Sequence, residues 1–381
     1  MRMDAVAEQS QQRPAAAAKG RRVLIALPGL HGVVRGAETA LEAIGRELSR
    51  LGDEVTLIGS GYARSAEPYR FVHAGCIGRK WFKYFPSLPY VRTAYGYEEL
   101  TFAPNLWRRY LPDEYDVTVT CGFPYCNRVL RRKGTRRRPV HVFVTQNGDH
   151  MAQATQRDYR AFACDGLVCT NNQYFERNRG KFRCRLIPNG VNPAVFLPGT
   201  GDRRGLGLPE EGKIALMVSA LIESKRVKEG IEAAAKVEGL NLVVAGDGEL
   251  RKEIEVFGKK MMGARFFLVS LPREKMPALY RSADVFLHMS TTEASANAYI
   301  EALASGLPIV THDWEVTRWT LEDVGVFVDS LDLTAVADGL RQAMGSGADV
   351  GRQRELVERR YSWASIGRQY AEFFDEVLAA V

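Results

Sequence analysis

The stretch "RVLIALPGLHGVVRGAETALEAIGRELSRLGDEVTLIGS", residues 22–60, decides the fold class. It begins with a short apolar run over 22–27 and continues through a turn rich in Pro and Gly. Apolar residues then recur at helical spacing over 37–52, and a second apolar run follows over 53–60. Strand, helix and strand in this order predict a βαβ unit and a parallel sheet.

The same alternation continues along the chain and is interrupted once. Strand-like runs occur at 115–121, 140–146 and 165–171, before a segment rich in Pro, Gly and Asn at 186–212. Beyond it, strands at 213–221, 241–246, 265–270, 285–290 and 307–312 alternate with helical segments. The sequence therefore predicts an α/β protein with two doubly wound Rossmann-like domains facing a central cleft.

The domain limits follow from this interruption and from the length of 381 residues, which favours two domains. We expect a disordered tail over 1–20, an N-terminal domain over 21–195 and a C-terminal domain over 196–355. The last segment, 356–381, has the pattern of an amphipathic helix and is expected to brace the two domains.

Composition excludes several classes of protein. No run of 18 or more apolar residues could span a bilayer, and the first twenty residues lack the apolar core of a signal peptide, so we expect neither insertion nor export. The six cysteines include no C-x-x-C pair, which favours reduced thiols and no metal site.

The net charge of +7 is unevenly distributed. Segment 128–139, "RVLRRKGTRRRP", suits a solvated loop or a patch for anionic lipid, phosphorylated substrate or nucleic acid, but no nucleic-acid-binding signature accompanies it. Segment 79–90, "RKWFKYFPSLPY", suits a membrane interface, a sugar-stacking loop or ordinary packing. We expect no nucleic acid partner and a peripheral contact with a membrane.

The chemistry concentrates in residues 291–310, "TTEASANAYIEALASGLPIV", where seven residues separate Glu293 from Glu301. Apolar residues surround Glu301 on every side of a predicted helix, and a buried carboxylate needs a partner. That partner is either an internal Arg or Lys or the vicinal hydroxyls of a ligand. The helix begins at "ASAN", whose N–H groups suit a phosphate. We therefore hypothesise that this stretch binds a nucleotide-linked substrate.

These blocks resemble the GT-B retaining glycosyltransferases of glycosyltransferase family 4. The two glutamates match the family's Glu, seven residues, Glu signature, and "EALASGLPIV" resembles its continuation. The segments "GLHGVVRGAETALEAIGRELSRLGDEVTLI", "IPNGVNPAVF", "VVAGDGELR" and "RSADVFLHMS" also resemble family blocks in the family's order. The resemblance covers nearly the whole chain from about residue 22.

The resemblance implies roles for individual residues. Glu301 would hold the ribose hydroxyls of a nucleotide, Glu293 would contact the donor sugar, and Lys225 would bind the diphosphate and stabilise the leaving group. The chain departs from the family at Ala220, where an Arg is usual, so Arg226 is expected to supply the second cation. Ser295 and Ala296 stand where Phe-Gly is usual.

Two further departures lie in the N-terminal domain. The family often places a His after the strand "HVFVT", whereas this chain has Gln146 followed by Asn147, Gly148, Asp149 and His150. His150 is the nearest candidate for the catalytic role of that His, and Asn147 and Asp149 are the alternatives. The glycines after the first strand, Gly29, Gly32 and Gly36, do not match G-x-G-x-x-G, so no hydride-transfer cofactor is expected.

The resemblance thus predicts retaining, metal-independent transfer from a UDP-, GDP- or similar sugar, with no cofactor, to a glycan, lipid-linked or small-molecule acceptor. We expect a cytoplasmic protein. A nucleotide-sugar epimerase and a non-catalytic sugar-nucleotide-binding homologue remain alternatives. The acceptor residues would be Asn147, Asp149 and His150, and the donor residues Gly32, Gly36, Ser219, Lys225, Arg226, Gly246, Val269, Leu271, Met276, Glu293, Ser295, Ala296, Asn297, Ala298 and Glu301.

Overall fold

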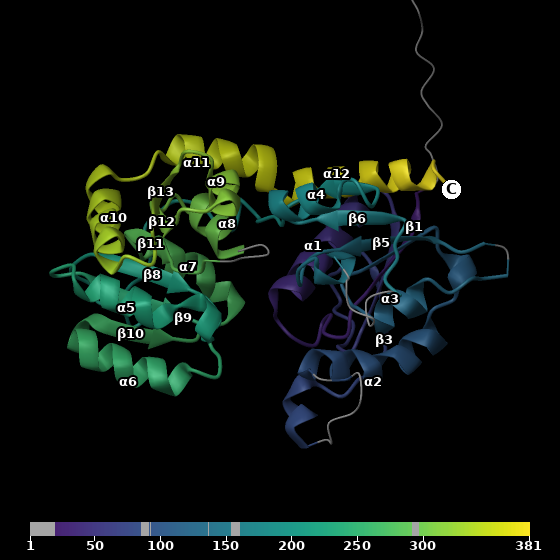
Figure 1. The fold of residues 1–381 in the computed structure, drawn as a ribbon, viewed down its shortest axis with the longest axis horizontal. Helices are drawn as coiled ribbons and strands as arrows, with labels where there is room; N and C mark the ends of the chain where they lie inside the picture. The colour runs from purple at the N-terminus through teal and green to yellow at the C-terminus, as the bar shows by residue number, and fades with distance from the viewer. Residues whose placement is uncertain (1–19, 85–90, 92, 136, 154–160, 292–296) are drawn as a thin grey trace, which may run out of the picture.

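The computed structural model describes residues 20–84, 91, 93–135, 137–153, 161–291 and 297–381. It has two lobes, each built on one parallel sheet with helices on both faces (Figure 1). The predicted fold class, two Rossmann-like domains, is confirmed. The expected tail over 1–20 lies outside the described residues except for Gly20.

The N-terminal sheet has seven parallel strands in the order β3-β2-β1-β4-β5-β6-β7. Its strands are β1 (Arg22–Ala26), β2 (Glu54–Gly59), β3 (Arg70–His73), β4 (Val117–Thr120), β5 (Val140–Val144), β6 (Gly166–Cys169) and β7 (Cys184–Leu186). The helices of this lobe are α1 (Gly36–Arg50), α2 (Ala94–Arg109), α3 (Tyr125–Leu130), α4 (Asn172–Asn178) and α12 (Trp363–Leu378).

The C-terminal sheet has six parallel strands in the order β10-β9-β8-β11-β12-β13. Its strands are β8 (Ile214–Val218), β9 (Asn241–Ala245), β10 (Phe266–Val269), β11 (Val285–His288), β12 (Ile309–His312) and β13 (Gly325–Val328). Its helices are α5 (Val227–Ala235), α6 (Arg251–Met262), α7 (Met276–Arg281), α8 (Asn297–Ala304), α9 (Glu315–Leu321), α10 (Leu333–Ser346) and α11 (Val350–Leu356).

All the strand-like runs of the sequence are confirmed as strands, and most form the centres of the two sheets, where continuous apolar runs are buried on both faces. Three strands, β3, β7 and β13, were not predicted from the sequence. Each lies at the edge of its sheet, and each is only three or four residues long and at most half-buried. β3 (RFVH) and β7 (CRL) have no apolar run to reveal them, whereas β13 (GVFV) is apolar but was overlooked.

The C-terminal segment crosses between the lobes. Leu356, Val357 and Tyr361 pack in the core of the C-terminal lobe. Helix α12 then returns to the N-terminal lobe, where its Ile366, Phe373 and other buried residues belong to the same core as β1, β4 and β5. Figure 1 shows α12, in yellow, lying along the N-terminal sheet and α1.

Candidate functional site

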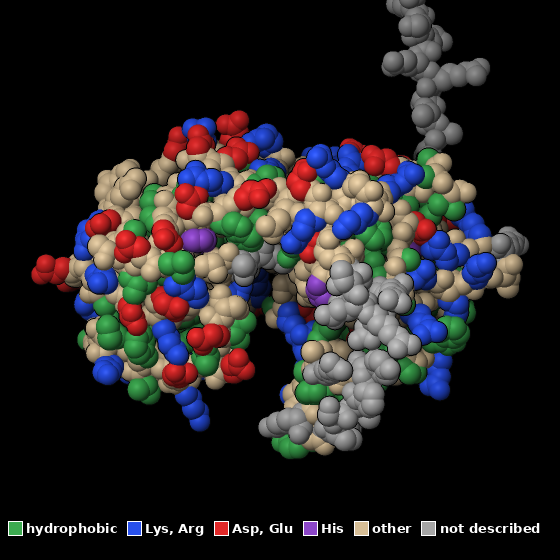
Figure 2. All heavy atoms as spheres, viewed as in Figure 1, with side chains coloured by type: hydrophobic (Ala, Val, Ile, Leu, Met, Phe, Trp, Pro, Cys, Tyr) green, Lys and Arg blue, Asp and Glu red, His purple; other side chains and the backbone are tan. Residues whose placement is uncertain are grey.

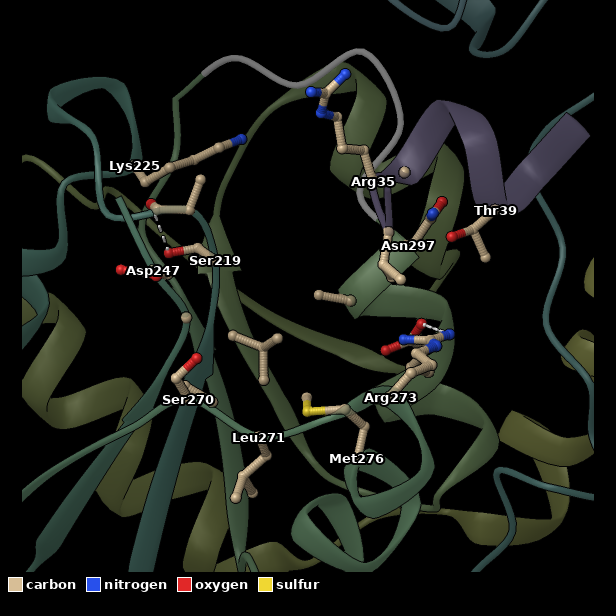
Figure 3. Close-up of a pocket in the computed structure, with 18 of the residues that line it drawn as sticks. Arg35, Thr39, Ser219, Lys225, Asp247, Ser270, Leu271, Arg273, Met276 and Asn297 are labelled. Carbon is tan, nitrogen blue, oxygen red and sulfur yellow. Dashed lines mark hydrogen bonds and ion pairs between the residues drawn. The ribbon is translucent and has the colours of Figure 1, made fainter. Parts of the chain in front are cut away.

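A cavity of about 650 Å³ lies between the two lobes at the carboxyl ends of β8, β9 and β11. In open α/β sheets ligands bind at this edge. Figure 2 shows the cleft between the lobes, and Figure 3 shows the residues that surround the cavity. We call it the interdomain cavity. It is lined by Val34, Arg35, Gly36, Thr39, Val218, Ser219, Ala220, Lys225, Ala245, Gly246, Asp247, Ser270, Leu271, Arg273, Met276, His288, Asn297, Ala298 and Glu301.

The turns after β8 and β9 come very close together at one wall. A Cβ added at Gly246 would lie 1.9 Å from the carbonyl oxygen of Ser219. Only glycine allows this contact, which keeps backbone groups of both turns at the cavity surface. Ser219 and Gly246, both predicted donor residues, therefore line the cavity together.

Lys225 ends a short helical turn, η5 (Glu223–Lys225), that follows β8. Figure 3 shows its side chain reaching toward the cavity from the side opposite Arg35 and Asn297. Arg226, expected to be a second cation of the site, is not among the lining residues. Its left-handed backbone, with φ of 50°, directs the guanidinium to Glu229 Oε1 (3.0 Å) and Ser330 Oγ (3.1 Å) instead.

Glu301 forms an ion pair with Arg273, whose Nη2 lies 2.5 Å from Glu301 Oε1. The glutamate is 4% exposed on α8, and both residues line the cavity. Desolvation acts to lower the pKa of Arg273, but the charge of Glu301 and the hydrogen bond outweigh it and raise the pKa. An internal arginine thus pairs with Glu301, which was one of the two expected partners, and the glutamate also lines the cavity.

The N-terminal lobe contributes Arg35, which directly precedes α1. Its Nη1 lies 3.2 Å from Glu38 Oε1 and 3.1 Å from Glu98 Oε2. Burial raises the pKa of the Glu38 carboxyl. These two carboxylates hold the guanidinium at the cavity wall, where Figure 3 shows it above Thr39 and Asn297.

Sequence reasoning missed six polar lining residues, which are Arg35, Thr39, Asp247, Ser270, Arg273 and His288. Arg35 stands in the loop after the first strand, and Arg273 stands just beyond β10. His288 is the last residue of β11, and its Nδ1 lies 2.8 Å from the hydroxyl of Tyr299. The carboxyl ends of parallel strands and the loops beyond them are where such sheets build their sites.

The predicted acceptor residues do not reach the cavity wall among the described residues. Asp149 is buried, and its carboxylate accepts hydrogen bonds from Arg177 (2.8 Å) and Asn178 (2.9 Å), so its visible role is to hold the N-terminal lobe together. Asn147 Nδ2 lies 3.9 Å from Cys121 Sγ. His150 is exposed, and desolvation lowers the pKa of its ring despite the opposing charge of Asp149.

The predicted donor residues divide into three groups. Gly36, Leu271, Met276, Asn297 and Ala298 line the cavity together with Ser219, Gly246, Lys225 and Glu301. Arg226, Gly32 and Val269 do not line it. Gly32 packs on Ser60 and Gly61, and Val269 packs against the core of the C-terminal lobe. Glu293, Ser295 and Ala296 lie outside the described residues.

No group of three or more His, Cys, Asp or Glu side chains is arranged to hold a metal ion among the described residues. In the same part of the chain no helix is long and apolar enough to cross a membrane.

Two family models match this chain in succession. The model for glycosyltransferase family 4 matches residues 34–195, and the model for glycosyl transferases group 1 matches residues 200–363. The chain belongs to glycosyltransferase family 4. The resemblance drawn from the sequence is confirmed, and the interdomain cavity lies where residues matched by the two models face each other.

Known members of the family are similar over part of their length. The D-inositol 3-phosphate glycosyltransferase of Mycolicibacterium smegmatis is 30% identical over 189 residues, covering 47% of this chain and 40% of that protein. The lipopolysaccharide core biosynthesis glycosyltransferase LpsE of Rhizobium meliloti is 28% identical over 203 residues, which cover 51% of this chain and 57% of that protein. The matches thus span about half the length of these curated relatives.

The fold is shared over nearly the whole chain with a solved structure. HepE of Anabaena, solved in complex with UDP and glucose, has a TM-score of 0.71 at 14% identity, and the match covers 93% of this family 4 chain and 100% of that one. At this identity the likeness shows the GT-B fold alone.

Proposed function

We propose that this family 4 chain is a glycosyltransferase that moves a sugar from a nucleoside diphosphate donor, bound in the interdomain cavity, to an acceptor held mainly by the N-terminal lobe. The observation that carries the proposal is Glu301, a buried carboxylate at the cavity wall beside the cation Arg273. Vicinal ribose hydroxyls suit the two oxygens of such a carboxylate.

The donor's charged part would lie between the cations of the cavity. Breaking the bond between the anomeric carbon and the diphosphate oxygen builds negative charge on the leaving group, and fixed cations stabilise that charge without reorganising. Lys225 and Arg35 approach the cavity from opposite sides, and Arg273 lies on a third. We assign the diphosphate to this space, and the donor sugar to the neighbourhood of Glu293.

Transfer would then proceed without a metal and with retention at the anomeric carbon, as the family resemblance implies. The acceptor's hydroxyl oxygen bonds to the anomeric carbon, the diphosphate leaves, and a phosphate oxygen takes the hydroxyl proton. Chelator should leave the rate unchanged. Proton NMR of the first product formed should show the donor's anomeric configuration.

The donor is testable by thermal shift with UDP, GDP, ADP and dTDP sugars. A ligand at a hundred times its dissociation constant stabilises the folded state by about 2.7 kcal/mol. We expect one of these donors to raise the Tm of the wild-type protein and to raise that of Glu301→Gln much less. UDP-glucose is the first choice, since the structural neighbour from Anabaena holds UDP and glucose.

Turnover separates this proposal from its alternatives. A transferase releases nucleoside diphosphate, an epimerase converts one nucleotide sugar into another without release, and a non-catalytic homologue binds without either reaction. Binding without turnover across a broad set of acceptors would favour the non-catalytic homologue. Interconversion of donors would favour the epimerase.

We also propose that the acceptor is reached at an anionic membrane surface, with the enzyme at its cytoplasmic face. Arg132 stacks over Trp107 at 4.2 Å, and Trp107, Arg108, Arg109 and Leu111 are exposed beside it. Figure 2 shows Lys and Arg side chains gathered on the N-terminal lobe. Exposed aromatic and basic residues together suit the headgroup region of a bilayer.

Vesicle sedimentation tests this contact. Binding to vesicles that contain phosphatidylglycerol, weakened by high salt and by Trp107→Ser, is expected, whereas phosphatidylcholine vesicles should not bind. Equal binding of wild type and Trp107→Ser would remove this surface from the proposal.

A further inference from the structure

Three amide side chains from distant parts of the chain form one hydrogen-bonded series. Gln146 follows β5, Asn189 lies in the connector after β7, and Asn297 is the first residue of α8. Gln146 Nε2 donates to Asn189 Oδ1 at 2.6 Å, and Asn189 Nδ2 donates to Gln146 Oε1 at 3.0 Å. Asn189 Nδ2 also donates to Asn297 Oδ1 at 2.8 Å.

The middle residue of this amide series, Asn189, is buried, and its side-chain oxygen and both N–H groups form hydrogen bonds. Asn189 is 3% exposed, its oxygen accepts one hydrogen bond, and its two N–H groups donate the other two. A buried amide that loses a partner leaves a polar group unsatisfied, which is costly. The orientation of Asn297 therefore depends on Asn189, and that of Asn189 depends on Gln146.

The C-terminal end of the series lies at the interdomain cavity. Because the oxygen of Asn297 accepts from Asn189, its amide nitrogen is directed to the other side, where it lies 3.6 Å from the position of a Cβ on Gly36. Asn297 lines the cavity, and Figure 3 shows it beside Thr39 and below Arg35. An amide N–H in this place is a donor for the oxygens of an anionic ligand.

The N-terminal end of the series lies in the loop that carries Asn147, Asp149 and His150. This loop is where the chain lacks the His that its family often has, and Asn297 belongs to the "ASAN" stretch, which also departs from the family pattern. The structure joins this loop to the first residue of α8 through Asn189.

We propose that Gln146 and Asn189 are positioning residues that hold the amide N–H groups of Asn297 toward the donor's diphosphate, and thereby link donor affinity to the loop after β5. This inference rests on the proposed function, since it presupposes that a nucleoside diphosphate occupies the cavity. Gln146 touches no ligand in this account and acts only through Asn297.

A double-mutant cycle tests the inference, with the affinity for UDP, or for whichever of UDP, GDP, ADP and dTDP binds tightest, measured by calorimetry. We expect Gln146→Ala and Asn297→Ala each to weaken binding several-fold to about tenfold, the range of one hydrogen bond. The double variant should bind no more weakly than Asn297→Ala alone. The proposal would be overturned if the fold-losses of affinity in the two single variants multiplied in the double variant. It would also be overturned if Gln146→Ala bound the diphosphate as tightly as wild type.

A second variant separates positioning of a ligand from a structural role. In Asn297→Asp the side chain still accepts the hydrogen bond from Asn189 but offers no N–H, and it places a negative charge toward the diphosphate. We expect a Tm close to that of wild type and a larger loss of affinity than in Asn297→Ala. If Asn297→Asp binds as tightly as wild type, Asn297 serves the fold alone and the proposal is wrong.

Asn105→Ala is the matched control, because Asn105 Nδ2 donates a hydrogen bond to Gly75 O (2.8 Å) in the N-terminal lobe and is not a lining residue. Asn105→Ala should bind the nucleoside diphosphate with the affinity of wild type. If the wild-type protein binds none of the four diphosphates, the proposed function fails and this inference fails with it. If the wild-type protein binds one of them and the cycle is additive, only this inference fails.

Discussion

Arg273 and Glu301 stand 28 positions apart in the chain, yet the arginine Nη2 lies 2.5 Å from the glutamate Oε1 on the wall of the interdomain cavity. The guanidinium also lies 5.0 Å from the ring centre of Phe196. This cation offsets the cost of placing a carboxylate on an otherwise apolar helix. Because Arg273 pairs with it, the Glu301 carboxylate can stay buried at the cavity wall without destabilising the fold.

Glu301→Gln should weaken the binding of a nucleoside diphosphate by roughly 10- to 100-fold, because a charged hydrogen bond to the ribose is worth about 1.5 to 3 kcal/mol. Calorimetry with the tightest of the four diphosphates measures this loss. Glu274→Gln, an exposed change next to Arg273, is the control and should bind normally. A variant with lowered Tm but wild-type affinity would reduce Glu301 to a structural partner of Arg273.

Lys225→Ala should lower kcat by roughly 100- to 1,000-fold, the usual effect of removing one group that stabilises charge in the transition state. Steady-state assays of diphosphate release measure this change. Lys228→Ala is the matched control, since Lys228 on α5 pairs with Glu253 on α6 (2.6 Å) and is not a lining residue. Equal rates for the two variants would exclude a catalytic role for Lys225.

Glu99 should make stability depend on pH. It is fully buried, its Oε1 accepts from the backbone N–H of Cys126 (2.8 Å), and burial raises its pKa from 4.5 to about 7. The folded state therefore holds a proton that the unfolded state has lost, so stability falls as pH rises from about 4.5 to about 7. Because Glu99→Gln does not titrate, its free energy of unfolding should rise relative to that of wild type by up to about 3 kcal/mol between pH 4.5 and pH 7.

Urea denaturation at pH 5 and pH 8 measures the difference. The amide of the variant still accepts the hydrogen bond from Cys126, so the fold should be retained. Glu210→Gln, an exposed change in the connector, should leave the wild-type pH dependence in place. Parallel stability curves for wild type and Glu99→Gln would contradict the prediction.

Phe373→Ala should destabilise the N-terminal lobe, even though Phe373 stands near the end of the chain. Its side chain is fully buried in the core that includes β1 and β5, and removing such a ring costs about 3 to 5 kcal/mol. Glu372→Ala, beside it on the exposed face, removes an ion pair with Arg185 and should cost at most about 1 kcal/mol. Similar denaturation midpoints for both variants would place α12 outside that core.

The sequence by itself determined the elements whose signal is local. Runs such as 22–27 and 241–246 are apolar because central parallel strands are buried on both faces, and this holds whatever the neighbouring strands are. Glu301 was identified in the same way, from an apolar helix that contains one carboxylate. Weak edge strands such as β7 gave no such signal.

Only the tertiary structure decided which distant groups meet. Arg273 rather than another cation pairs with Glu301, Arg35 reaches the cavity from the other lobe, and Arg226 turns away from it. Asn189 lies 43 positions from Gln146 and 108 from Asn297, and it contacts both. These meetings depend on strand order, loop conformation and the placement of the two lobes, which no local period of apolar residues encodes.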